Sequence, residues 1–116
     1  MKIETIDLNR SNIYLVKVEG RLDAGFASQL EDELDRLLEK TKRIIIDFSE
    51  VTYLSSSGLR VLLSVKKETD KQGGLVLVNM VDVVKRIIQV AELDDFFSQA
   101  DSVEEAITLL EKKSAA

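Results

Sequence analysis

The chain has 116 residues, of which 45% are hydrophobic and 32% charged, and its formal net charge at pH 7 is −5. This is the length of one domain, and the acidic balance argues against a general binder of nucleic acids or anionic membranes. Cysteine and histidine are both absent. Their absence excludes disulfides, zinc-thiolate sites and catalysis by Ser-His-Asp or Cys-His arrangements.

No apolar stretch approaches the roughly 18 residues of a membrane span, and the first residues carry no apolar signal region. We therefore expect a cytoplasmic chain without membrane insertion. No linker, low-complexity segment or internal repeat divides the sequence. It predicts a single domain over residues 1–116.

The first part of the chain predicts two strands and a helix. Residues 2–8 and 13–18 alternate apolar and polar side chains, which indicates an antiparallel pair joined by a turn. We expect Gly20 to break the second strand. Asp23 stands where a helix cap belongs, and large apolar side chains follow it at helical spacing, namely Phe26, Leu30, Leu34, Leu37 and Leu38.

Two short apolar runs mark the middle of the chain. Ile44-Ile45-Ile46 with Phe48, and later residues 75–78, are typical of strands covered on both faces, as in a parallel sheet. Between them, residues 59–69 have helical spacing, and we expect Gly73 and Gly74 to close that helix.

The last part of the chain predicts two further helices, at residues 84–91 and 103–110, and Phe96-Phe97 fits either a brief strand or an apolar plug. The predicted order is thus β-β-α-β-α-β-α-(β)-α. Neighbouring βα units favour right-handed crossovers and parallel pairing of the central strands. We therefore predict an α/β fold, with a mixed β-sheet whose central strands are parallel and which about four helices cover.

A serine-rich turn joins the Ile44–Phe48 region to the following helix. Ser55, Ser56 and Ser57 stand in a row before Gly58, at an edge of the sheet where α/β proteins usually bind ligands. Helix N-termini present unpaired N–H groups there, which either a serine cap or a phosphate can satisfy. Both readings stay open, although one serine is enough for a cap.

Gly58 lies just inside the helix, where glycine costs about 1 kcal/mol relative to alanine. Three causes would each explain a glycine here: close approach of another backbone, close approach of a partner, or simple packing against the sheet. The turn has neither the G-x-S-x-G spacing of a hydrolase nor the Gly-Lys-Ser/Thr of a P-loop. We expect no enzyme, no catalytic residue, no cofactor and no metal site.

Residues 47–49 with 53–59 strongly resemble the signature of the anti-sigma factor antagonists, the single-domain bacterial members of the STAS (sulfate transporter and anti-sigma antagonist) family. The resemblance covers nearly the whole chain and implies a STAS-like fold. It extends to residues 20–23, to Gly73-Gly74 with the apolar strand after it, and to residues 84–87 through Leu93.

This resemblance implies a phosphorylation switch. In the family, the unphosphorylated protein binds an anti-sigma factor that is also a serine kinase and so displaces the sigma factor. From the acidic balance, we expect no direct binding of nucleic acid. Phosphorylation of a serine in the turn ends that binding, and a PP2C-type phosphatase restores it. The negative charge of the phosphate should prevent binding of the anti-sigma factor without changing the fold.

The family pattern Asp-Ser-Ser/Thr-Gly-Leu maps onto this chain residue by residue. It makes Ser56 the expected phosphoacceptor, with Ser57 as its neighbour. Ser55 departs from the pattern because it stands where the family has the aspartate, so Ser57 and Ser55 are the alternative acceptors. Asp23 resembles the acidic residue near the acceptor. The implied partner-binding residues are Asp23, Ser55, Ser56, Ser57, Gly58 and Leu59.

Two rival functions stay open. A STAS subunit of another assembly, such as a lipid-transport complex or a signalling scaffold, would use the same turn as a constitutive docking surface. A nucleotide-binding domain would place a phosphate at the helix N-terminus, but the chain lacks a glycine-rich cradle and its lysine.

Overall fold

The computed structural model describes residues 2–71 and 73–115. Its elements follow the predicted order. They are β1 (Lys2–Asp7), β2 (Ile13–Leu22), α1 (Ala24–Leu38), β3 (Arg43–Leu54), α2 (Ser56–Thr69), β4 (Gly74–Val78), α3 (Asp82–Val90), β5 (Ser98–Ala100) and α4 (Val103–Ala115).

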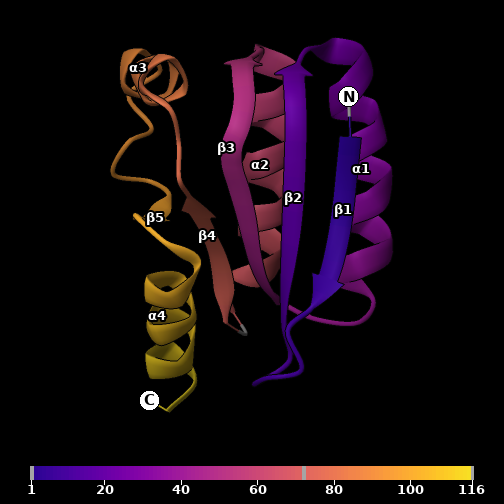
Figure 1. Ribbon diagram of the computed structural model, residues 1–116, viewed down its shortest axis with the longest axis vertical. Helices are drawn as coiled ribbons and strands as arrows, with labels where there is room; N and C mark the ends of the chain where they lie inside the picture. The colour runs from indigo at the N-terminus through magenta and orange to yellow at the C-terminus, as the bar shows by residue number, and fades with distance from the viewer. Residues whose placement is uncertain (1, 72, 116) are drawn as a thin grey trace.

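The five strands form one sheet in the order β1-β2-β3-β4-β5. β1 pairs antiparallel with β2, whereas every other neighbouring pair is parallel. This confirms the predicted mixed sheet with parallel central strands. α1 and α2 lie behind the sheet as Figure 1 shows it, and α4 packs on β3 and β4 from the opposite side.

The isoleucine run in β3 explains how the two faces of the sheet are covered. Ile44 and Ile46 belong to the core beneath α1 and α2, whereas Ile45 belongs to the smaller core beneath α4. All three side chains are fully buried. Successive side chains of a strand point to opposite faces, so a continuous apolar run is what a strand between two helical layers requires.

The carboxyl ends of β2 and β3 meet at one end of the sheet, where α1 and α2 begin (Figure 1). The two strands stay paired as far as Leu22 and Leu54. The prediction that Gly20 breaks the second strand is therefore wrong. Gly20 instead has a positive φ of 110° at an irregularity in the β2–β3 register, which is the conformation that glycine tolerates best.

Two other expectations are corrected. Gly73 and Gly74 do not close α2, because that helix ends at Thr69 and Asp70 caps it; the two glycines, both with positive φ, lead into β4 instead. The brief strand β5 begins just after the two phenylalanines. Phe97 is buried, but Phe96 is 50% exposed, so only one of the pair belongs to the core.

No helix among the residues that the structure describes is long and apolar enough to cross a membrane.

Gly58 allows α2 to lie close against the sheet. An added Cβ would stand 2.8 Å from Leu54 Cδ1 and 2.9 Å from Leu22 Cγ, closer than real Cβ contacts come, and both leucines are buried. Side-chain packing thus explains this glycine without a partner. At Gly25 near the start of α1, the nearest atom would be Asp23 Oδ1 at 3.7 Å, an ordinary contact.

We expect Gly58→Ala to destabilise the fold and Gly25→Ala, its matched control, to stabilise it. Overpacking costs about 1–3 kcal/mol, against a gain in helix propensity of about 1 kcal/mol. Gly25→Ala should show only the gain. Urea unfolding of both variants measures the difference, and equal stabilisation by the two substitutions would contradict the packing account.

Glu111 of α4 forms hydrogen bonds with the turn between β1 and β2. Its carboxylate accepts hydrogen bonds from Arg10 Nε at 2.8 Å and from Ser11 Oγ at 2.8 Å. These contacts, with Arg10 contributing most, lower the pKa of Glu111 from its usual value. A carboxylate with a lowered folded pKa stabilises the fold above its unfolded pKa, and that contribution disappears as the pH falls through the folded pKa.

We therefore expect Glu111→Gln to lower the melting temperature at pH 7 and to converge with the parent protein in strong acid, near about pH 2. Melting curves at intervals over that range measure this. Glu68→Gln, which removes a carboxylate without a partner in the described part of the chain, is the control. A Glu111→Gln deficit that persisted unchanged in acid would contradict the ionic origin.

Candidate functional site

The carbonyl of Leu22, the last residue of β2, holds the serine turn. It accepts a hydrogen bond from the backbone N of Ser55 at 2.9 Å and a second from Ser55 Oγ at 2.8 Å. Ser55 Oγ in turn accepts from Gly58 N at 3.1 Å. Ser55 is therefore the N-cap of α2 and also the link between β3 and the end of β2.

Asp23 caps α1 in the same way, as the sequence predicts. Its side chain accepts a hydrogen bond from Phe26 N at 3.0 Å. Because Asp23 follows Leu22 and Ser55 follows Leu54, and those leucines are register partners, the N-termini of α1 and α2 lie next to each other. The positive ends of both helix dipoles therefore lie at the carboxyl ends of β2 and β3.

The three serines have different environments. Ser55 is half-buried and fully engaged as described above. Ser56, the first residue of α2, is exposed, and Ser57 is half-buried. Neither the Ser56 nor the Ser57 hydroxyl has a hydrogen-bond partner among the described residues. The expectation that one serine suffices as a cap is confirmed, and two hydroxyls are left without a capping role.

The remaining predicted partner-binding residues differ in their access to the surface. Gly58 is buried beneath Leu22 and Leu54, so its role is to let α2 approach the sheet. Leu59 and Asp23 are half-buried. A surface offered to a partner here would therefore consist of polar serines, one carboxylate and one leucine around two helix N-termini.

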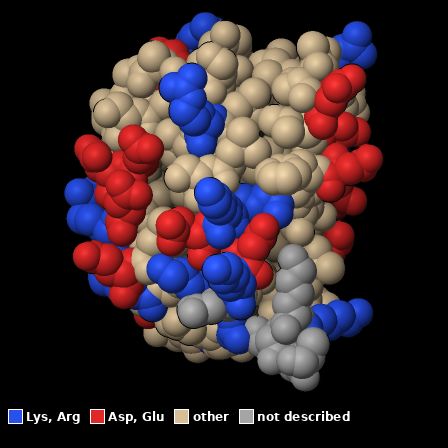
Figure 2. Space-filling model, turned by 180° about the vertical axis from the view of Figure 1, so that it is seen from behind, with Lys and Arg blue, Asp and Glu red and all other residues tan. Residues whose placement is uncertain are grey.

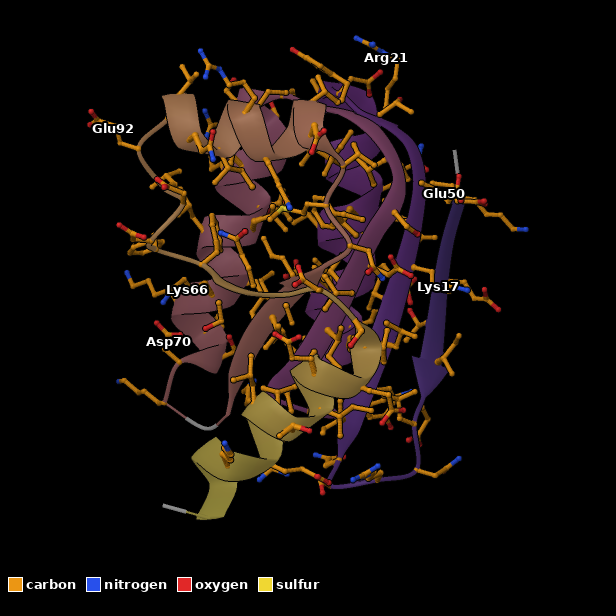
Figure 3. All side chains as sticks on the ribbon, turned by 60° about the vertical axis from the view of Figure 1, so that its left-hand side comes forward. Lys17, Arg21, Glu50, Lys66, Asp70 and Glu92 are labelled. Carbon is orange, nitrogen blue, oxygen red and sulfur yellow. The ribbon has the colours of Figure 1, made fainter. Side chains whose placement is uncertain are left out.

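Sequence reasoning missed an aromatic contact beside the turn. The Arg21 guanidinium lies 4.4 Å from the centre of the Tyr53 ring, and the two residues are register partners in β2 and β3. Figure 3 shows Arg21 at the end of the sheet where α1 and α2 begin. In the sequence, Arg21 stands two positions before the cap Asp23, and Tyr53 two positions before the cap Ser55. This spacing indicates a contact only when the pairing of β2 with β3 is already known.

A polar hollow of about 320 Å³ lies away from this turn, between β1, β2 and β3. Opposite charges face each other across the strands there, because Lys2 pairs with Glu19, and Glu4 with Lys17. Lys17 and Glu50 of this lining are labelled in Figure 3. Within the described ranges, no group of three or more acidic side chains is arranged to hold a metal ion.

The chain is similar to known proteins over most of its length. Residues 6–106 match the STAS domain family. BtrV of Bordetella bronchiseptica, which is classed with the anti-sigma factor antagonists, is 34% identical over 91 residues, which are 77% of this chain and 78% of BtrV. The anti-sigma-B factor antagonist of Bacillus subtilis is 30% identical over 96 residues, which are 82% of this chain and 88% of that protein.

Solved structures show the same fold. An anti-sigma factor antagonist from Mycobacterium paratuberculosis superposes with a TM-score of 0.82 at 25% identity, over 95% of each chain. The unphosphorylated form of the anti-sigma factor antagonist SpoIIAA gives a TM-score of 0.80 at 21% identity over 96% of this chain and 97% of that one. The phosphorylated form of SpoIIAA from Bacillus gives 0.70 at 21% identity over 92% and 97%.

The family match and the two relatives each span more than two thirds of this chain. They confirm the family expected from the serine turn and its surroundings. The chain therefore belongs to the STAS domain family, among the non-catalytic anti-sigma factor antagonists.

Proposed function

We propose that the unphosphorylated protein binds an anti-sigma factor with serine kinase activity through the surface around the serine turn, and that phosphorylation of Ser56 ends this binding. The observation that carries the proposal is the exposed Ser56 hydroxyl, which makes no hydrogen bond within the described chain. Family membership supplies the class of partner. A PP2C-type phosphatase would reverse the modification.

The structure favours Ser56 over its two neighbours for physical reasons. Phosphorylation of Ser55 would remove the proton that its Oγ donates to the Leu22 carbonyl and would disturb the cap on Gly58 N. Ser57 is less accessible than Ser56. A kinase can therefore reach Ser56 with the least disturbance of the fold.

A phosphate on Ser56 would change the surface more than the fold. It adds about −1.5 to −2 charges at neutral pH, which the N-terminus of α2 offsets by about 0.3–1 kcal/mol. A partner pressed against the turn would have to desolvate this group, and because a dianion stays negative even beside one cation of this chain, the cost is several kcal/mol unless the partner supplies a cation of its own. Since about 1.4 kcal/mol is a tenfold change in affinity, the partner is lost.

Relatives in both chemical states support the proposal. SpoIIAA, whose fold this chain shares, has been solved in an unphosphorylated and in a phosphorylated form. A switch of this kind is therefore compatible with the fold. Ser55 in place of the family's aspartate is the feature that favours the rival reading, a STAS subunit that docks constitutively.

We expect incubation with ATP and an anti-sigma kinase from the same genome to add one phosphate, mapped by peptide mass spectrometry to Ser56 and absent from Ser56→Ala. The phosphorylated protein should bind the anti-sigma factor at least about tenfold more weakly, with its backbone amide spectrum changed only near the turn.

Stability separates the roles of the serines. Ser55→Ala should cost about 1 kcal/mol through loss of the cap, whereas Ser56→Ala should stay within about 0.5 kcal/mol of the parent protein. Ser56→Ala is therefore a sound non-phosphorylatable variant. Phosphate found on Ser57 or Ser55 would keep the function and move the site.

Other outcomes distinguish the rival functions. A stable complex with a partner protein whose affinity does not change on phosphorylation would favour the constitutive docking subunit. Micromolar binding of ATP or GTP in a direct titration would favour the nucleotide-binding reading. If no anti-sigma factor bound or modified the protein, the proposed function would be wrong, although the family assignment would stand.

A further inference from the structure

Arg60 lies one helical turn after the proposed phosphoacceptor. It occupies position i+4 relative to Ser56 on α2 and is exposed. Residues four apart share a helix face, and side chains of a helix lean toward its N-terminus. Helix geometry therefore lets the Arg60 guanidinium reach back toward the first turn, where Ser56 stands.

No other group in the described chain engages Arg60. It has no ion pair or hydrogen bond there, and its neighbours at three and four residues on α2 are uncharged: Ser56, Ser57, Leu63 and Ser64. By contrast, Lys66 on the same helix pairs with Asp70 at 2.6 Å and lies 4.5 Å from the centre of the Phe96 ring.

The surroundings offer little competition for this cation. α1 packs against α2 and carries no charged residue between Asp23 and Glu31. In Figure 2, which views the molecule from the α1 and α2 side, charged side chains gather on the lower half and along both sides, whereas the upper middle is mostly tan around a patch of blue and shows no red. A new anion at the start of α2 would thus find Arg60 available.

We propose that Arg60 is the built-in counter-cation of phosphoserine 56, an inference that rests on the proposed function. The guanidinium pairs with two phosphate oxygens in the fork geometry that arginine offers to oxyanions. The pair favours the dianion over the monoanion and turns the phosphate back along α2. Phosphorylation therefore gives a phosphate that is held along α2 and carries slightly more of its second negative charge near neutral pH than it would without the arginine.

The test places phosphoserine at position 56 by genetic encoding, so that no kinase is needed, and follows the phosphate by ³¹P NMR as the pH is varied. The second pKa of phosphoserine is about 6. We expect Arg60→Gln to raise it by about 0.15–0.4 pH unit relative to the parent protein. Arg60→Lys, which keeps the charge but not the fork, should recover part of the shift.

Lys67→Gln is the matched control. It removes the same charge from the same face of α2, 11 residues after Ser56, which is about 16 Å along the helix axis. We expect the second pKa of phosphoserine in Lys67→Gln to equal that in the parent protein. Raising the salt concentration to about 1 M should shrink the Arg60→Gln shift, because the Debye length falls to about 3 Å.

The ionisable groups that adjoin the turn in sequence or strand register are Asp23, the N-cap of α1, Arg21 on β2 and Tyr53 on β3. They are present in every variant, so the difference between variants reports Arg60 alone. Parent and Arg60→Gln proteins that titrate together would overturn the inference. So would a shift in Lys67→Gln as large as that in Arg60→Gln.

Binding assays with the same phosphorylated proteins keep the two proposals apart. If the ³¹P shift is found but phosphorylation does not weaken binding to the anti-sigma factor, the proposed function fails and the Arg60 pair stands. If phosphorylation weakens binding but Arg60→Gln leaves the titration unchanged, the pair is overturned and the switch stands.

Discussion

The end of the sheet that carries the candidate site depends on one carbonyl group. Leu22 O accepts from both the backbone N and the hydroxyl of Ser55, and it thereby joins the ends of β2 and β3 at the point where each strand gives way to a helix. A buried carbonyl has two lone pairs and is costly to leave unpaired. Satisfying both from one residue fixes where α2 begins relative to α1, and Gly58 then lets α2 settle against Leu22 itself.

In the proposed switch, structural work and regulatory chemistry fall on different members of three consecutive serines. Ser55 holds the turn and caps the helix, so any chemistry at its oxygen would disturb the fold. Ser56 has an exposed hydroxyl with no partner in the described chain, so the proposed phosphorylation there would leave the hydrogen bonds of the turn in place. A reversible switch needs such a division, because a site that also held the fold together would couple each modification to partial unfolding.

The sequence revealed the elements well where local chemistry decides them. Asp23 was predicted to be a cap from its place before an apolar helical pattern, and the Ile44-Ile45-Ile46 run was predicted to be a doubly covered strand; both are confirmed. Gly20 was misread because its tolerance of positive φ serves a strand irregularity as readily as a strand end. The Arg21–Tyr53 contact depends on pairing between strands that are far apart in sequence, so no local pattern could have shown it.

Ser55 also explains how the turn can form without the aspartate that the resemblance to the anti-sigma factor antagonists places at this position. A carboxylate can accept the hydrogen bond from Gly58 N, but it has no proton to donate to the Leu22 carbonyl when ionised. Ser55 Oγ accepts from Gly58 N and also donates to the Leu22 carbonyl, and it carries no charge, so the turn has one negative charge fewer than it would have with aspartate. Arg60, one helical turn later, makes the local charge more positive as well. In the proposed switch, the two residues together would make the start of α2 more favourable for a phosphate dianion, so Ser55 and Arg60 belong to one electrostatic environment.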